Sequence, residues 1–76
     1  MYKWKIDIFL KGSNVIKHCV YIGPEKNSAD VAMKLFNDRK DSYYVDLYGD
    51  NEKSLTYVRI GEIAAFDICE GRKVND

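Results

Sequence analysis

The chain opens on a regular alternation of apolar and polar positions. The even-numbered residues from Trp4 to Leu10 are all large and apolar, whereas Lys3, Lys5 and Asp7 between them are charged. A period of two is typical of a strand with one face toward a core and one toward water. We therefore predict a strand over 2–10.

A second apolar run over 15–22 follows a Gly-Ser pair, which predicts an N-terminal β-hairpin within 1–23. A two-residue loop would place Ile6 opposite Cys19, and a three-residue loop would place it opposite Val20. The second register buries more aliphatic surface at the cost of one imidazole. We predict the three-residue loop, with Asn14 in the left-handed region of backbone space.

Gly23-Pro24 ends the hairpin, because proline cannot donate a ladder hydrogen bond. A helix over 27–40 is predicted next, with Asn27 or Ser28 as its N-cap. Its apolar stripe follows the spacing i, i+1, i+4 and i+5. The stripe consists of Val31, Ala32, Leu35 and Phe36.

Short alternating runs fill the region 43–70 and predict three further strands, separated by a polar turn and by Gly61. The polar tail 71–76 is expected to fray. The whole chain, 1–76, is thus predicted to form a single small α+β domain. The element order is ββαβββ, and an antiparallel sheet of four to five strands carries one helix packed on one face.

Charge is balanced over the chain but divided along it. The formal net charge is zero, yet four Lys and one Asp give +3 over 1–23, while four basic and eight acidic residues give −4 over 41–76. A basic hairpin beside acidic strands would compensate this charge within one sheet. The same division could steer two copies together or attract a partner.

Composition and motifs argue against catalysis. The single histidine, His18, precedes Cys19, and neighbours in a strand point to opposite faces, so the two cannot form a nucleophile–base pair. No metal-ligand spacing and no glycine-rich phosphate loop occurs in the sequence. We predict no catalytic residue, no cofactor and no metal. The absence of a signal-like or membrane-spanning apolar run, with only two cysteines, predicts a cytoplasmic protein.

Three stretches carry a resemblance to a known group. The segment Tyr57–Ile68 resembles the closing strand-turn-strand of short uncharacterised proteins from Gram-positive bacteria and their prophages, and 4–12 and 28–36 share the same general pattern. Together these segments cover 30 of the 76 residues. The resemblance implies a small intracellular protein, with a mobile element as a candidate source. It implies no activity, because none of the three segments is a catalytic or binding motif.

Tyrosine is the most informative residue type. The chain has six tyrosines, more than a core of this size can bury with every hydroxyl satisfied. Tyrosine is enriched in protein interfaces, although half-exposed tyrosine is also common in strands. Since one helix cannot cover a whole sheet, we expect the bare face to bind a second copy, as a homodimer, or another protein. The candidate interaction surface comprises Phe9, Tyr21, Tyr44, Tyr48 and Tyr57.

An alternative function is single-stranded nucleic-acid binding on a lysine-rich, aromatic sheet face. The candidate residues are Lys3, Lys5, Lys11 and Lys17. Lysine on strands also prevents unwanted edge pairing, and the domain as a whole is neutral. Nucleic acid is therefore the less favoured partner.

Overall fold

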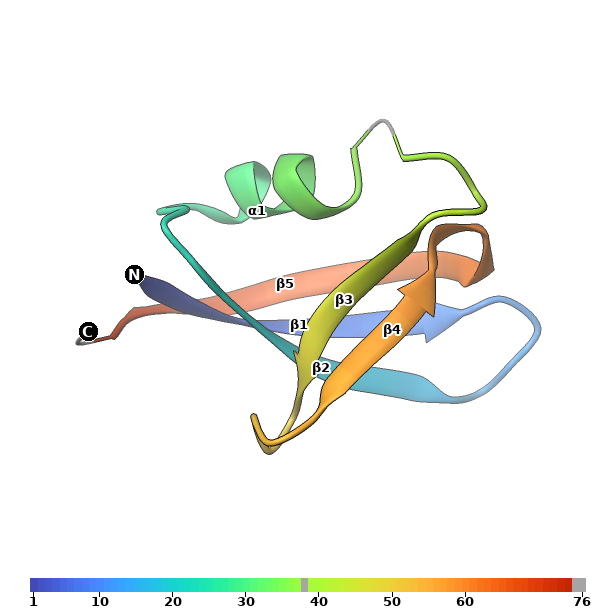
Figure 1. Ribbon diagram of the computed structural model, residues 1–76, viewed down its shortest axis with the longest axis horizontal. Helices are drawn as coiled ribbons and strands as arrows, with labels where there is room; N and C mark the ends of the chain where they lie inside the picture. Colours follow the sequence, from blue (N-terminus) through green and yellow to red (C-terminus); the bar gives the residue numbers. More distant parts are fainter. Residues whose placement is uncertain (38, 75–76) are drawn as a thin grey trace.

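A computed structural model describes residues 1–37 and 39–74. Five strands form one antiparallel sheet in the order β4-β3-β2-β1-β5, with a helix against one face (Figure 1). The elements are β1 (Tyr2–Leu10), β2 (Ile16–Gly23), α1 (Ser28–Leu35), β3 (Tyr44–Gly49), β4 (Leu55–Arg59), the 3₁₀-helix η1 (Ile60–Glu62) and β5 (Ile63–Lys73). The predicted α+β class and the ββαβββ order are confirmed.

The two edge strands of the sheet are consecutive in the chain. β4 and β5 lie at opposite ends of the strand order, yet only the three residues of η1 join them. The sheet must therefore curl until these edges meet at one end. Backbone bonds fix this corner: the Lys11 N–H donates to the Glu62 carbonyl and the Ile60 N–H donates to the Tyr43 carbonyl, both at 2.8 Å. In Figure 1 the β3–β4 pair runs diagonally across the other strands.

The core lies on the concave side of this curled sheet. Ile6 and Ile8, two of the alternating residues of β1, are fully buried there. The helix contributes Val31 and Leu35, and the β3–β4 pair contributes Val45, Leu47 and Val58. Phe36, just past the helix, stacks on Phe66 of β5 with ring centroids 4.0 Å apart. The core is thus closed by α1 on one side and by the curled β3–β4 pair on the other.

The predicted register of the first hairpin is wrong. Ile6 pairs with Cys19, and Asp7 with His18, as the two-residue loop requires. Gly12, not Asn14, has the positive φ in this turn (66°). The observed register keeps the imidazole out of the core. Val20 lies on the convex face, opposite Tyr48 of β3, and is nevertheless buried.

The helix begins as predicted but ends earlier. Asn27 is the N-cap, and its Oδ1 accepts from the Asp30 N–H at 2.9 Å. The α-helix ends at Leu35, before the predicted end at 40, and residue 38 lies outside the described residues.

The C-terminal strand is longer than predicted. β5 continues to Lys73, so that 71–73 are paired strand rather than frayed tail, while 75–76 lie outside the described residues. The partners are the first residues of β1, since Tyr2 pairs with Lys73 and Lys3 with Arg72. Pairing with β5 thus extends from Tyr2 to Leu10 of β1, with register shifts between Lys3 and Lys5 and between Phe9 and Leu10.

Candidate interaction surface

The β3–β4 pair turns an aromatic face toward solvent. Val45, Leu47 and Val58 point into the core, so strand alternation places the intervening residues on the convex side. We call this convex set the outer tyrosine face. It comprises Tyr44, Asp46, Tyr48, Leu55, Tyr57 and Arg59. Tyr44, Leu55 and Tyr57 are 61%, 51% and 63% exposed, so the chain itself leaves most of their surface uncovered.

Cross-strand pairing sets the neighbours on this face. Tyr44 lies opposite Arg59, Asp46 opposite Tyr57, and Tyr48 opposite Leu55. The ladder bonds at the two ends of the pair, from the Ile60 N–H to the Tyr43 carbonyl and from the Gly49 N–H to the Ser54 carbonyl, are both 2.8 Å. Because bonded and non-bonded pairs alternate, all three pairs of the outer face are non-bonded pairs, in which side chains approach most closely.

The same alternation decides where the backbone groups of β4 point. The N–H and C=O groups of Thr56 and Val58 face β3, whereas those of Leu55, Tyr57 and Arg59 face away from it. β4 is an edge strand, so this second set is turned toward solvent. Among the residues that the structure describes, no strand pairs with this side of β4, so a row of outward-facing donors and acceptors borders the outer tyrosine face.

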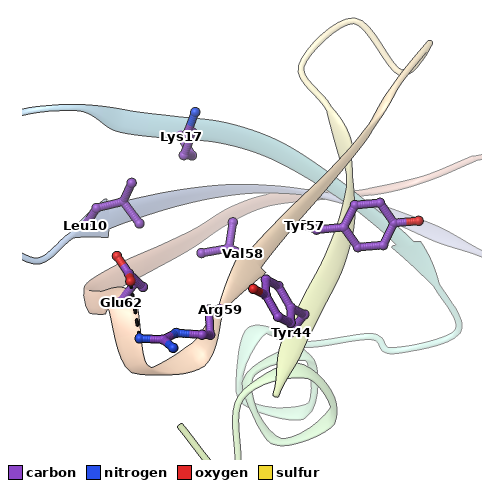
Figure 2. A pocket seen from close by; sticks show the side chains of 7 residues that line it. All are labelled: Leu10, Lys17, Tyr44, Tyr57, Val58, Arg59 and Glu62. Carbon is purple, nitrogen blue, oxygen red and sulfur yellow. Dashed lines mark hydrogen bonds and ion pairs between the residues drawn. The ribbon is translucent and has the colours of Figure 1, made fainter. Parts of the chain in front are cut away.

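A hollow of about 350 Å³ opens beside this edge (Figure 2). It lies between β4 and the turn end of the first hairpin, from which Leu10 of β1 and Lys17 of β2 reach it. The hollow is lined by Leu10, Lys17, Tyr44, Tyr57, Val58, Arg59 and Glu62. The Arg59 guanidinium lies 3.4 Å from Glu62 Oε1, as the dashed line in Figure 2 marks. Lys17 has no ion-pair partner within residues 1–37 and 39–74.

The structure brings together three of the five predicted surface residues, namely Tyr44, Tyr48 and Tyr57. Phe9 is half-buried on the convex side of β1, where it pairs with Ile16 and Ala65 and is not part of the outer tyrosine face.

Tyr21 lies on the core side instead. It pairs with Trp4, contacts the core, and donates its hydroxyl to Glu25 Oε1 at 2.6 Å. Burial, followed by this hydrogen bond to Glu25, raises the pKa of Tyr21 to about 12. Sequence alternation could not place this side chain, because the assignment depended on the hairpin register.

Leu55, Asp46 and Arg59 were not among the predicted surface residues. The sequence does show that Leu55 and Arg59 share a strand face with Tyr57, because these three residues alternate with Thr56 and Val58. Which of the two sets faces the core became clear only from the pairing of β4 with β3.

The four lysines of the alternative do not form one face. Lys3 makes an ion pair with Glu52, and Lys5 Nζ lies 3.0 Å from Glu70 Oε2. The hydrogen bond to Glu70 raises the pKa of Lys5. Lys11 lies in the hairpin turn and Lys17 borders the hollow. These ion pairs confirm the predicted compensation between the basic hairpin and the acidic C-terminal half.

The remaining polar groups are dispersed. His18 Nδ1 lies 2.8 Å from Asp7 Oδ1 on the convex side. Cys19 and Cys69 are free thiols, the first buried and the second exposed, and burial raises the pKa of Cys19. Within the described ranges, no three His, Cys, Asp or Glu side chains gather as a metal site would require. Nor does any helix described there have the length and apolar character to cross a membrane.

Comparison of the chain with protein-family models, with curated proteins and with solved structures found no match. The outer tyrosine face is therefore interpreted from its own chemistry. It combines aromatic rings, hydroxyl tips, one carboxylate and one guanidinium. Tyrosine and arginine are enriched where proteins bind each other, since each carries a large apolar body and a polar end.

Proposed function

We propose that this protein is a non-enzymatic cytoplasmic interaction module that binds a protein surface, its own or another, through the outer tyrosine face. The observation that carries the proposal is the exposure of Tyr44, Leu55 and Tyr57 on two neighbouring strands. The core is covered by α1 and by the inward-facing residues of β3 and β4, which leaves these three side chains exposed to solvent.

Energetics support the choice of this face. Exposed tyrosines cost little conformational entropy when they are immobilised, because each has only two side-chain torsions. Hot-spot residues at the centre of an interface are enriched in tyrosine and arginine. Truncating one of them costs about 2 kcal/mol or more of binding free energy. A face with Tyr44 and Tyr57 near Asp46 and Arg59 offers such anchors together with polar groups that fix orientation.

The polar groups of the described residues support a non-enzymatic role. His18 is engaged with Asp7 on the convex side, whereas Cys19 faces the core with its pKa raised, which favours the unreactive thiol. A nucleophile and its base must lie within hydrogen-bond reach of each other. His18 and Cys19 point to opposite sides of the strand.

The test compares a surface variant with a matched control. Tyr44→Ser/Tyr57→Ser removes two rings from the outer tyrosine face, and Met33→Ser removes an equally exposed apolar side chain from α1. We expect association measured by light scattering, or capture of a protein on the immobilised chain, to be lost in the double variant and kept in the control. Equal association or capture by the wild type, the double variant and the control would refute the proposal.

A further inference from the structure

The free edge of β4 has a geometry that can be satisfied by a second copy of itself. We propose that β4 pairs edge to edge with β4 of a second copy, antiparallel and about a two-fold axis through Tyr57, so that the two sheets join into one. This inference rests on the proposed function and names its partner as another copy of this chain.

Of the two sheet edges, β4 is the less protected one, because its single charged residue is Arg59 at its end. Edge strands usually avoid pairing through bulges, charges, proline or coverage by another element. β5 has such protection. Its pairing with β1 has a register shift between Lys3 and Lys5, and Glu70, opposite this shift, has a positive φ (57°). The helix α1 also contacts β5. β4 pairs with β3 in one unbroken register and contains no proline.

The backbone of β4 is self-complementary. Its outward-facing N–H and C=O groups belong to Leu55, Tyr57 and Arg59, which are spaced evenly about Tyr57. On a two-fold axis there, Tyr57 lies opposite Tyr57 of the second copy, and Leu55 lies opposite Arg59. In each of these pairs both residues turn their donors and acceptors toward the partner strand, as a hydrogen-bonded antiparallel pair requires.

The side chains on the convex side also fit this arrangement. The Tyr57 rings of the two copies become neighbours, which favours an aromatic pair. Arg59 comes to lie between Tyr44 of its own chain and Leu55 of the second copy. A guanidinium on an aromatic face gains a cation–π contact, and its aliphatic stem covers the leucine.

Self-complementarity selects a second copy as the occupant. β4 ends at Arg59, where η1 turns the chain toward β5, so the pairing spans Leu55–Arg59. Within this span the two-fold axis makes the contact between Leu55 and Arg59 twice, and another strand would match it only with the same spacing of an apolar side chain and a guanidinium. The zero net charge of each chain adds no general repulsion.

Opposite charges at position 57 test the two-fold axis. We expect Tyr57→Lys and Tyr57→Glu each to be monomeric by light scattering, because each places two like charges against one another. An equimolar mixture should recover the dimer, since lysine then faces glutamate. Wild type and the control Met33→Lys should both be dimeric. Two monomeric variants whose mixture stays monomeric would overturn the proposed axis.

Amide hydrogen exchange tests the backbone pairing. The N–H groups of Leu55, Tyr57 and Arg59 should become protected only as protein concentration rises. Those of Thr56 and Val58, which face β3, should be protected at every concentration and also report that each variant is folded. A dimer whose three outward amides still exchange freely overturns edge pairing.

The two proposals fail differently. A strictly monomeric wild type that still captures another protein through Tyr57 overturns self-pairing and leaves the proposed function standing. A monomeric wild type that captures the same proteins as its Tyr44→Ser/Tyr57→Ser variant overturns both the proposed function and the self-pairing of β4.

Discussion

The indole of Trp4 lies against the backbone of Gly71. A Cβ added to Gly71 would stand 2.6 Å from Cζ2 of the ring, well inside van der Waals contact. The indole is also held by its Nε1–H, which donates to the Glu25 carbonyl at 3.1 Å. Trp4 therefore ties β1, β5 and the segment before α1 together, and glycine is needed because no side chain fits between ring and strand.

Gly71→Ala should destabilise the fold. The added methyl must displace a ring that is only 7% exposed, and such overpacking costs about 1–3 kcal/mol. In a domain of this size that loss lowers the melting temperature by roughly 4–8 °C per kcal/mol. Thermal unfolding followed by tryptophan fluorescence measures it. Cys69→Ala, an exposed change two residues away, is the control, and equal melting temperatures for the two variants would contradict the Trp4–Gly71 contact.

Tyr21 should make stability depend on pH in the alkaline range. Its pKa in the folded state, about 12, lies above the ordinary value of about 10, so folding favours the neutral phenol. This contribution to the free energy of unfolding is complete below pH 10 and is lost as the pH rises toward 12.

An ultraviolet titration should show a phenol with a pKa of about 12, and Tyr21→Phe should remove this step. A wild type and a Tyr21→Phe variant with the same titration curve would show that Tyr21 is not held neutral by burial and by Glu25.

The two thiols should differ in accessibility. Cys69 is exposed, whereas Cys19 is 2% exposed with its pKa raised, so a thiol reagent should modify Cys69 in the native protein and Cys19 only after unfolding. Measuring the chromophore released with and without denaturant gives the number of reactive thiols in the unfolded and in the native protein. Cys69→Ala should show no fast reaction, and rapid reaction in that variant would place Cys19 outside the core.

Oligonucleotides should bind poorly. Lys3 and Lys5 are already paired with Glu52 and Glu70, so few cations remain to displace the counterions of a nucleic acid. We expect no quenching of tryptophan or tyrosine fluorescence on titration with single-stranded DNA at low salt. Salt-sensitive binding that weakens in Lys11→Ala or Lys17→Ala would revive the nucleic-acid alternative.

Local patterns in the sequence predicted the elements well. The alternation of β1 correctly predicted that Ile6 and Ile8 face the core, and side-chain chemistry narrowed the N-cap to Asn27 or Ser28, of which Asn27 is the cap. Both depend on neighbours a few residues away.

Long-range pairing explains what the sequence did not predict. The hairpin register failed because Cys19 and Val20 are both buried on a curled sheet, which removes the alternation that would distinguish the registers. Tyr44 and Tyr48 were correctly placed on one face, but the exposed edge beside Tyr57 follows from the strand order, which no local pattern encodes.

The position of β1 between β2 and β5 also has a consequence for assembly. Ile6 pairs with Cys19 on one side and with Ile68 on the other, and the second partner is 62 positions away in the chain. The first hairpin can form early from nearby residues, whereas the edge strand β5 is added only when a loop spanning most of the polypeptide closes. Non-local closure of this kind slows folding, so refolding is expected to be limited by the β1–β5 encounter rather than by either hairpin.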